Sequence, residues 1–134
     1  EGNAGADTIN GNTGNDLMRG GLGADDFVFA YWADSGTTAL TRDVILDFKR
    51  SQGDKIDLSG VDAINATVGV NEGFTFAGSA FSNVAGQVIF QKFNNAGTAH
   101  DYTLISGDIT GGGAANFTIE VTGLVDFRAG DFIL

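Results

Sequence analysis

The stretch that decides the fold is GNAGADTIN from Gly2 to Asn10, GNTGNDLMR from Gly11 to Arg19 and GGLGADDFV from Gly20 to Val28. Aligned by nines, the three segments fit the pattern G-G-x-G-x-D-x-U-x, in which U is an apolar residue. A short repeat of fixed period is one structural unit that buries its apolar residue only by stacking on its neighbours. The first part of the chain is therefore predicted to form a solenoid.

Aspartate recurs at every ninth position of this stretch and beyond it, at Asp7, Asp16, Asp25, Asp34 and Asp43. In each unit a six-residue turn is followed by three residues that can span only a short strand. Two units then make one coil of eighteen residues, so turns eighteen residues apart become neighbours. The spacing predicts Asp7 beside Asp25 and Asp25 beside Asp43 on one edge, and Asp16 beside Asp34 on the other.

The glycines and asparagines of the turns meet a backbone requirement. A turn that aims its carbonyl oxygens inward needs angles that a residue with a Cβ resists. Asn3 and Asn12 stand where glycine is usual, and asparagine tolerates the left-handed region best. Carbonyls and carboxylates, with no His or Cys near them, form an oxygen-only ligand set. This set favours calcium over magnesium or zinc.

The repeats resemble those of the RTX, or haemolysin-type, calcium-binding proteins, and the chain as a whole is similar to the C-terminal domain of serralysin-type secreted metalloproteases. Beyond the three nonapeptides, four segments carry the resemblance: 26–29 (DFVF), 43–48 (DVILDF), 53–59 (GDKIDLS) and 131–134 (DFIL). The resemblance implies an all-β fold with a short parallel β-roll, in which calcium ions lie between stacked loops.

In that family the ions are held by the carbonyls of the second and fourth positions of each repeat and by the aspartate at the sixth. Carried over by position, the expected ligands are Asn3, Gly5, Asp7, Asn12, Gly14, Asp16, Gly21, Gly23 and Asp25. Asp34 and Asp43 are added because they keep the spacing. They lack the glycines, so ordinary turn aspartates that happen to be in phase are the alternative. We expect about three Ca²⁺ ions.

Four other aspartates are not decided by the sequence. Asp47, Asp54 and Asp57 either bind another cation or pair with Lys49, Arg50 and Lys55. Asp108 lies in the segment GDITGGG (107–113), where related sequences often carry an aspartate-rich, EF-hand-like turn. Because Asp108 is its only charged oxygen donor, we interpret this segment as a flexible turn.

Composition agrees with an all-β fold that binds cations. The chain has 134 residues, 43% of them hydrophobic, with 21 glycines, no proline and no cysteine. Its net charge of −10 with only seven Lys and Arg argues against nucleic acid as a partner, because phosphate binding needs clustered basic residues. The chain contains no apolar run long enough to span a membrane.

After the repeats the period changes from nine to simple alternation. Strands are predicted at 86–93, 99–105 and 116–122, with a hairpin turn at 94–97. They form a mainly antiparallel sheet or sandwich that caps the roll, with bulk supplied by Phe74, Phe76, Phe90, Phe93 and Phe117. We predict a repeat unit at 1–35 and a C-terminal β cap at 36–134 that fold together.

The chain ends in Asp131-Phe132-Ile133-Leu134, which resembles the terminal motif of substrates of type I, ABC-transporter-driven secretion in Gram-negative bacteria. The alternative is a final strand tucked into the sheet, and the two roles can hold at different times. Because Glu1 falls inside a repeat, we expect upstream repeats or a catalytic domain in the parent protein.

No catalytic motif is found in the sequence. The zinc-protease motif H-E-x-x-H needs two histidines and His100 is the only one; the chain also lacks G-x-S-x-G and cysteine. We interpret His100 as a surface residue. Two functions remain: a calcium-dependent, non-catalytic C-terminal module of a secreted, extracellular protein, or an adhesive or polysaccharide-binding RTX module. In the second, Tyr31 and Trp32 would form a sugar platform.

Overall fold

The computed structural model describes residues 1–96 and 100–134, and the strands there are joined by turns and loops without an α-helix. The only helical segments described are three short 3-10 turns, none of them long or apolar enough to cross a membrane. In chain order the elements are β1 (Asn3–Ala4), β2 (Thr8–Ile9), β3 (Leu17–Met18), β4 (Gly21–Leu22), β5 (Asp26–Val28), η1 (Trp32–Asp34), β6 (Asp43–Ile45), η2 (Arg50–Gln52), β7 (Lys55–Asp57), β8 (Thr75–Phe76), β9 (Gln87–Phe93), β10 (Tyr102–Asp108), β11 (Phe117–Thr122), η3 (Ala129–Asp131) and β12 (Phe132–Ile133).

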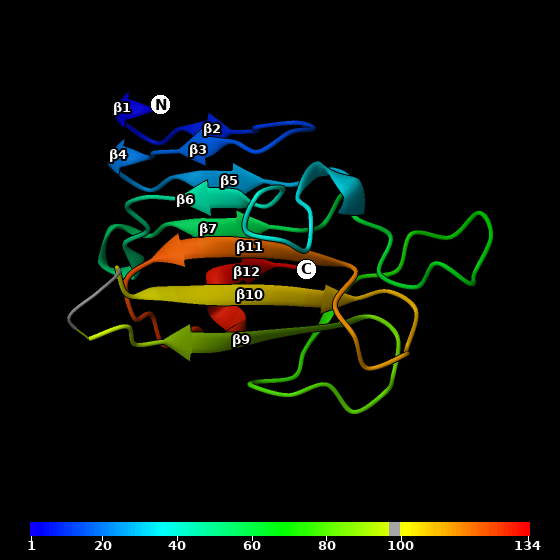
Figure 1. Ribbon diagram of the computed structural model, residues 1–134. Helices are drawn as coiled ribbons and strands as arrows, with labels where there is room; N and C mark the ends of the chain where they lie inside the picture. Colours follow the sequence, from blue (N-terminus) through cyan, green and yellow to red (C-terminus); the bar gives the residue numbers. More distant parts are fainter. Residues whose placement is uncertain (97–99) are drawn as a thin grey trace.

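The first seven strands form a parallel β-roll, as predicted. Strand β1 pairs with β4, β2 with β5, β3 with β6 and β5 with β7, all in parallel. Figure 1 shows these short strands stacked one below another, with the N-terminus at the free end of the stack. In the first coil Thr8 lies opposite Asp26, which is the predicted step of eighteen residues.

The step between stacked turns then changes, and here the prediction was wrong. Asp16 stacks on Asp43, 27 residues away, instead of on Asp34. Asp25 stacks on Asp54, 29 residues away, instead of on Asp43. The cause is the segment between β5 and β6, which contains η1 and a loop closed on itself by the bond from Gly36 N to Thr41 O (2.9 Å). This segment adds residues without adding a coil.

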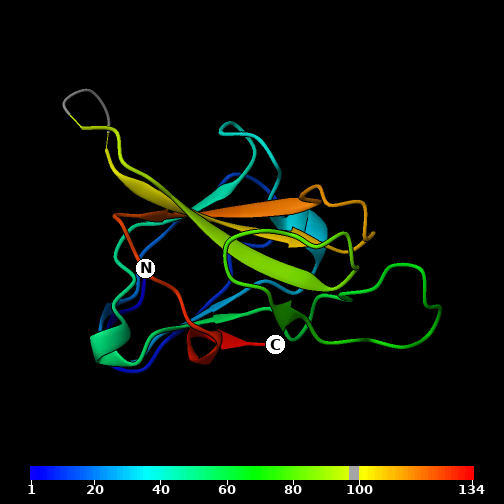
Figure 2. The same cartoon turned by 90° about the horizontal axis from the view of Figure 1, so that it is seen from below.

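Three long strands continue the roll as an antiparallel sheet. Strand β10 pairs antiparallel with β9 and β11, and β11 pairs in parallel with β6 of the roll. The strands predicted at 86–93, 99–105 and 116–122 therefore correspond to β9, β10 and β11. The start of the second prediction, Ala99, and the end of the predicted hairpin turn, Gly97, lie outside the described residues. In Figure 2 these strands cross over the roll as one twisted layer.

The core lies between two sheets, one with strand order β3-β6-β11-β10-β9-β8 and the other with strand order β12-β7-β5-β2. The eighth-position residues Met18 and Phe27 are buried, and Ile45 and Ile56 continue their rows in β6 and β7. Five phenylalanines were expected to supply bulk to the core, and for Phe93 this prediction was wrong. Phe93 lies three residues from Phe90 on β9, so its side chain faces the other side of the sheet. It is 36% exposed there and stacks on Tyr102 with ring centroids 4.8 Å apart.

We predict that an alanine in the third turn is worse than the same change in the first. Gly5 and Gly23 both have positive φ (124° and 130°), which costs an alanine about 1–3 kcal/mol. A Cβ on Gly23 would also lie 1.9 Å from Gly5 O of the stacked turn, whereas a Cβ on Gly5 meets no atom within 4 Å. Gly23→Ala is therefore expected to lower the free energy of unfolding more than Gly5→Ala in urea titrations with calcium present.

The matched control is Gly130→Ala, whose Cβ meets no described atom within 4 Å and whose φ is not positive. It is expected to change stability by no more than about 0.5 kcal/mol. Equal losses for Gly5→Ala and Gly23→Ala would contradict the close stacking of the two turns.

Candidate metal centre

The turns of the three repeats have the backbone that inward carbonyls require. The second and fourth positions all have positive φ, between 60° and 146°: Asn3, Gly5, Asn12, Gly14, Gly21 and Gly23. The left-handed conformation predicted for Asn3 and Asn12 is thus confirmed. The carbonyl oxygens of Asn3 and Gly5 lie against Gly21 and Gly23 of the stacked turn, so close that a Cβ there would sit about 2 Å from them. Carbonyl oxygens therefore line the space between turns.

The aspartates link each turn to the next through one carboxylate oxygen. Asp7 N donates to Asp25 Oδ1 at 3.0 Å, Asp16 N to Asp43 Oδ1 at 2.9 Å and Asp25 N to Asp54 Oδ1 at 3.2 Å. The carboxylates thus stack along two edges of the roll. This arrangement brings like charges together.

The second carboxylate oxygen is left without a partner at four of these aspartates. Among the described residues, no hydrogen-bond donor meets the buried Oδ2 of Asp7, Asp16, Asp25 or Asp43. A buried carboxylate oxygen without a partner is strongly unfavourable unless a cation compensates it. Burial raises the pKa of Asp43 to about 6, against the lowering effect of the Asp16 amide, and the negative charges of Asp16 and Asp34 add to the rise.

The first glycine of each repeat makes room for these side chains. A Cβ on Gly2 or Gly20 would lie 2.6 Å or 2.4 Å from the Oδ2 of Asp7 or Asp25 in the same repeat. On Gly11 it would lie 2.9 Å from the Cβ of Asp16. The unpartnered oxygens therefore sit in cradles that only glycine leaves open.

Three other aspartates have backbone partners instead of free oxygens. Asp54 accepts the amides of Asp25 and Lys49 (2.7 Å), and burial raises its pKa. Asp47 accepts the amides of Gly20 and Gly21 at 2.9 and 3.1 Å, a role in the third turn that the sequence analysis missed. Asp34 Oδ2 accepts the amides of Ala30 and Tyr31 at 3.0 Å and so closes η1.

Pairing with basic side chains, one of the two alternatives for Asp47, Asp54 and Asp57, is not observed within residues 1–96 and 100–134. Asp57 accepts the amide and hydroxyl of Ser59, and Arg50 pairs with Asp131 near the C-terminus. The sequence contains one signal for Asp47. It lies two residues after β6, and Asp57 likewise lies at the end of β7. Its partners, however, are 26 and 27 residues away in sequence.

Asp108 organises the turn that was interpreted as flexible. Its carboxylate accepts the amides of Thr110, Gly111 and Gly113 at 3.0, 2.8 and 2.7 Å. Burial would raise its pKa, but these hydrogen bonds outweigh it and hold the pKa below its usual range. The turn from Gly107 to Gly113 is therefore ordered around one saturated carboxylate.

The side chains that could hold a metal come in pairs. Within residues 1–96 and 100–134, no three His, Cys, Asp or Glu side chains converge on one point. A cation between stacked turns would therefore take most of its ligands from backbone carbonyls and the rest from the unpartnered Oδ2 atoms. Many oxygen ligands in flexible geometry suit calcium, and the scarcity of His and Cys argues against zinc.

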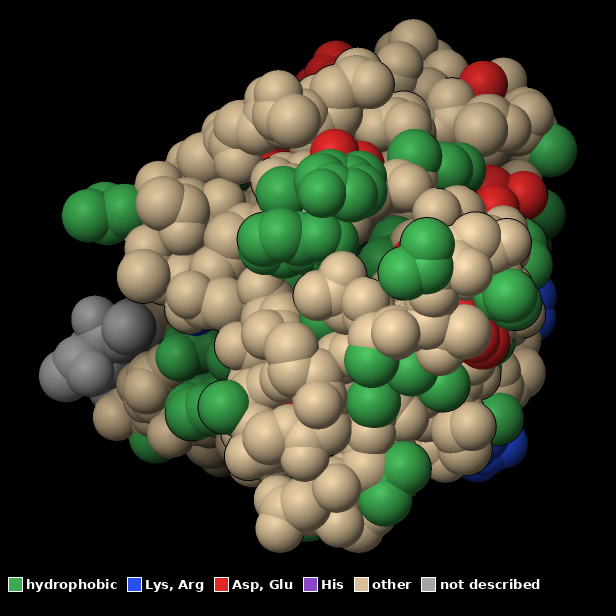
Figure 3. All heavy atoms as spheres, turned by 90° about the vertical axis from the view of Figure 1, so that its right-hand side faces the viewer, with side chains coloured by type: hydrophobic (Ala, Val, Ile, Leu, Met, Phe, Trp, Pro, Cys, Tyr) green, Lys and Arg blue, Asp and Glu red, His purple; other side chains and the backbone are tan. Residues whose placement is uncertain are grey.

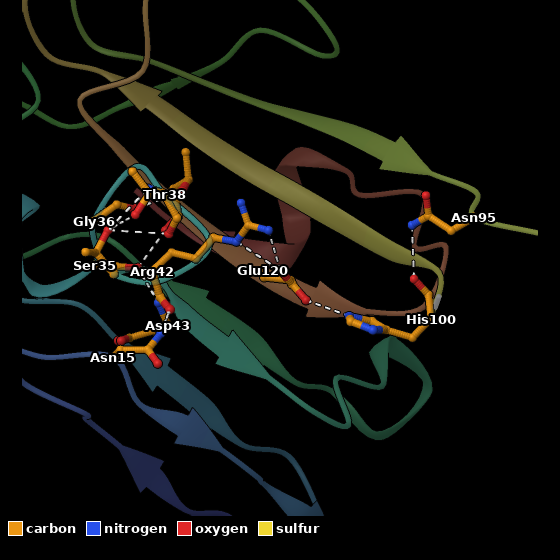
Figure 4. A network of polar contacts seen from close by, with 11 residues as sticks. Asn15, Ser35, Gly36, Thr38, Arg42, Asp43, Asn95, His100 and Glu120 are labelled. Atoms are coloured by element: carbon orange, nitrogen blue, oxygen red, sulfur yellow. Dashed lines mark hydrogen bonds and ion pairs between the residues drawn. The ribbon is translucent and has the colours of Figure 1, made fainter. Parts of the chain in front are cut away.

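Figure 4 shows how Asn15, Asp43 and Arg42, from the second pair of stacked turns, are linked to the antiparallel sheet. The Asn15 side chain donates to Arg42 O, and Asp43 N donates to Ser35 Oγ, which in turn donates to Thr118 O of β11 at 2.6 Å. The Arg42 guanidinium binds Glu120 Oε2 of β11 at 2.6 Å. The turn pair and β11 are thus joined directly by hydrogen bonds and an ion pair.

The same network includes His100, which is a surface residue as predicted. Its ring is largely exposed, but Nε2 lies 2.8 Å from Glu120 Oε1. Burial alone would raise the pKa of Glu120, but the hydrogen bonds from His100 and Arg42 outweigh it and lower the pKa. Glu120 is therefore a buried, charged residue held by two partners.

The chain was compared with protein families and with solved structures. The chain matches the family model described as Peptidase M10 serralysin C terminal over residues 3–134. Two solved structures from the Azotobacter vinelandii mannuronan C5-epimerase, the AlgE6R3 and AlgE6R2 subunits, match at 27% identity with TM-scores of 0.59 and 0.58. The alignments cover 98% and 94% of this chain and 65% and 69% of those chains. No curated protein matches it.

We predict that acid partly replaces a cation at Asp43. Its folded-state pKa of about 6 lies above the ordinary 3.8, so its contribution to stability is complete below pH 3.8 and is lost as the pH rises through about 6. In a chelator, the β signal in circular dichroism is expected to be larger at pH 5 than at pH 7.5. Asp43→Asn should raise the signal at pH 7.5, and the exposed Asp126→Asn should not. A parent-like signal from Asp43→Asn would contradict the assignment.

We predict that the Arg42–Glu120 pair is needed for the stability of the cap. Arg42→Met leaves a buried carboxylate with His100 alone and is expected to cost about 3–5 kcal/mol in urea unfolding with calcium. The matched control is Lys92→Met, which removes the surface pair with Asp126 and is expected to cost less than about 1 kcal/mol. The double variant Arg42→Met, Glu120→Met should recover much of the loss. Equal effects of the two single variants would refute the role given to burial.

Proposed function

We propose that this chain, which belongs to the peptidase M10 serralysin C-terminal family, is a non-catalytic module that binds calcium between its stacked turns and folds on binding it. The expected ions number about three, one for each pair of turns linked through an aspartate. The residues that would hold them are the carbonyls of the second and fourth positions and the aspartates at the sixth. We include Asp43 among these residues because its carboxylate accepts the amide of Asp16 and leaves Oδ2 without a partner.

One observation supports this proposal above all others: the buried, unpartnered Oδ2 of four aspartates in the turns. Asp54, in the same edge stack as Asp7 and Asp25, has both carboxylate oxygens hydrogen-bonded. Among the described residues, buried oxygens without a partner also occur at Gln52 and Glu72, but only the four aspartates have theirs in the hydrogen-bonded stacks of turns.

Calcium would supply positive charge to a chain whose net charge is −10, and would join turns that otherwise repel each other. Sites of extracellular calcium-binding modules have dissociation constants of about 10⁻⁴–10⁻³ M. At millimolar calcium outside a cell such sites are occupied, and the folded state is favoured by mass action. At the low free calcium inside a cell the turns would stay unfolded. The ion would therefore make folding depend on location.

Export through the type I, ABC-transporter-driven machinery completes the proposal. The last four residues, which resemble its terminal motif, have a structural role in the folded chain. Phe132 and Ile133 form β12 against β7, and Asp131 is bound by Arg50. These residues would be read by the transporter before folding and would join the sheet afterwards, outside the cell. The parent protein would carry an upstream catalytic or repeat domain.

The division at residue 35 into repeats and cap stays a proposal about how the module folds. The roll strands β5 and β6 lie on either side of this position, and β6 is joined to both β3 and β11. Such pairing is in keeping with one folding unit, as proposed. The repeats and the cap would then form together on calcium binding.

We predict that the β signal in circular dichroism appears with calcium and disappears with a chelator. Asp25→Asn removes an unpartnered oxygen from a carboxylate that also bonds Asp7 N, so the calcium midpoint should rise about tenfold or more. Asp126→Asn, at an exposed carboxylate, is the matched control and should leave the midpoint unchanged. Spectra that are identical with calcium and with chelator would defeat the proposal.

A second function, binding of a polysaccharide, is favoured by one feature. Tyr31 and Trp32 are 56% and 37% exposed, with ring centroids 5.6 Å apart, and so are available as a sugar platform. The similar solved structures come from an enzyme named for mannuronan. Figure 3 shows the right-hand side of the view in Figure 1, where apolar side chains lie among polar and backbone atoms and basic side chains are seen only at the margin. An anionic sugar chain would find little positive charge there.

A further inference from the structure

A hollow of about 460 Å³ lies on the side of the antiparallel sheet that faces away from the core. Its floor is formed by Ile89, Ser106 and Thr118, which lie side by side on β9, β10 and β11. Their neighbours in these strands, such as Val88, Ile105 and Phe117, point into the core instead. A hollow of this size is within the range of sites for small ligands.

The walls of the hollow are held in place by hydrogen bonds. On one side, Thr118 Oγ1 donates to Gly36 O at 2.8 Å, next to the wall residue Thr37. On the other side, Gly113 is bound to Asp108 and packs against Asn83, so closely that a Cβ on Gly113 would lie 2.0 Å from Asn83 Oδ1. Because the walls are fixed before any ligand arrives, little ordering is needed on binding.

The Phe81 wall is fixed as well. Ser82 N donates to Gln87 Oε1, and Gln87 Nε2 donates to Ser82 Oγ, both at 2.8 Å. This pair of bonds joins the loop that carries Phe81 to the start of β9. The hollow is therefore open to solvent and bordered by three loops that are each anchored to the sheet.

The lining combines apolar surface with uncharged polar groups. Phe81, Ile89 and Leu104 supply the apolar surface, and Thr37, Gln91 and Ser106 supply hydroxyl or amide groups. Ser106 is 5% exposed. None of the described lining residues is ionisable.

Charges near the hollow are already paired. On the two neighbouring rungs of the sheet, Glu120 is bound by Arg42 and His100, and Asp108 by three backbone amides. A carboxylate or phosphate ligand would find no free cation, and the net charge of −10 would repel it. A cationic ligand would find no free carboxylate. A fitting ligand is therefore uncharged, with hydroxyls on some sides and C–H groups on others.

We propose that this hollow binds an uncharged pyranose unit of a glycan, with the ring against Phe81 and Leu104 and its hydroxyls bonded to Gln91 and Ser106. None of the residues involved is a proposed calcium ligand, so the proposal does not rest on the metal assignment. It gives the second candidate function a site away from Tyr31 and Trp32 and a neutral ligand class.

The test is an NMR titration of amide shifts in calcium-containing buffer. The probes are the neutral cellotetraose, maltotetraose, laminaritetraose and mannotetraose, with a mannuronate tetrasaccharide as the charged comparison. At least one neutral probe is expected to shift the amides of Gln91, Leu104 and Ser106. Gln91→Ala and Leu104→Trp should weaken its binding about tenfold or more, the first by removing a polar group and the second by filling the hollow.

Two variants serve as comparisons. Thr122→Ala changes an exposed residue on β11 outside the hollow and should leave binding unchanged, and Trp32→Ala should do so too. Shifts confined to the mannuronate, loss of binding in Trp32→Ala but not in Leu104→Trp, or no shift at the hollow with any neutral probe would each overturn the proposal. Well-dispersed amide spectra report the fold in every sample, so failure here leaves the calcium proposal untouched.

Discussion

The structure depends on a hydrogen bond between an aspartate amide of one turn and an aspartate carboxylate of the next. The bonds from Asp7 to Asp25, from Asp16 to Asp43 and from Asp25 to Asp54 join the turns along both edges of the roll. Each of them requires a carboxylate inside the stack, where charge is costly. The small glycines at the first position and the carbonyls between turns follow from the same requirement, because the carboxylate must be given space and a compensating partner.

The end of the roll differs from its beginning in how carboxylates are satisfied. Asp54 and Asp47 use both oxygens on backbone amides, and the turn that carries Asp54 also carries Arg50, which binds Asp131. The carboxylate in the last turn of this edge is therefore satisfied by backbone amides of the protein. The same turn binds the C-terminal segment to the roll through Arg50. The C-terminal strand β12 pairs with β7 beside this contact.

The roll and the antiparallel layer are joined at β6, and the joint is polar as well as apolar. Ile45 of β6 lies opposite Val121 of β11 within the core, while the Arg42–Glu120 pair closes the outer side. Arg42, which binds Glu120 of the cap, directly precedes Asp43, which stacks on Asp16 in the roll. Folding of the turns and of the cap is thereby coupled through neighbouring residues.

Local pattern determined the roll itself. The period of nine, the glycines and asparagines with positive φ, and the buried Met18 and Phe27 all depend on interactions within a repeat or with the next identical one. Alternation likewise predicted β9, β10 and β11, and oxygen-rich turns predicted the type of candidate site. Only the tertiary structure decided which turns meet. The loop between β5 and β6 folds back through Gly36 and Thr41, so Asp43 stacks on Asp16 and Asp54 on Asp25, and Asp47 reaches the third turn. The path of this irregular loop decides which turns become neighbours. The sequence shows no periodic signal for that path, because the residues that close the loop lie outside the repeats.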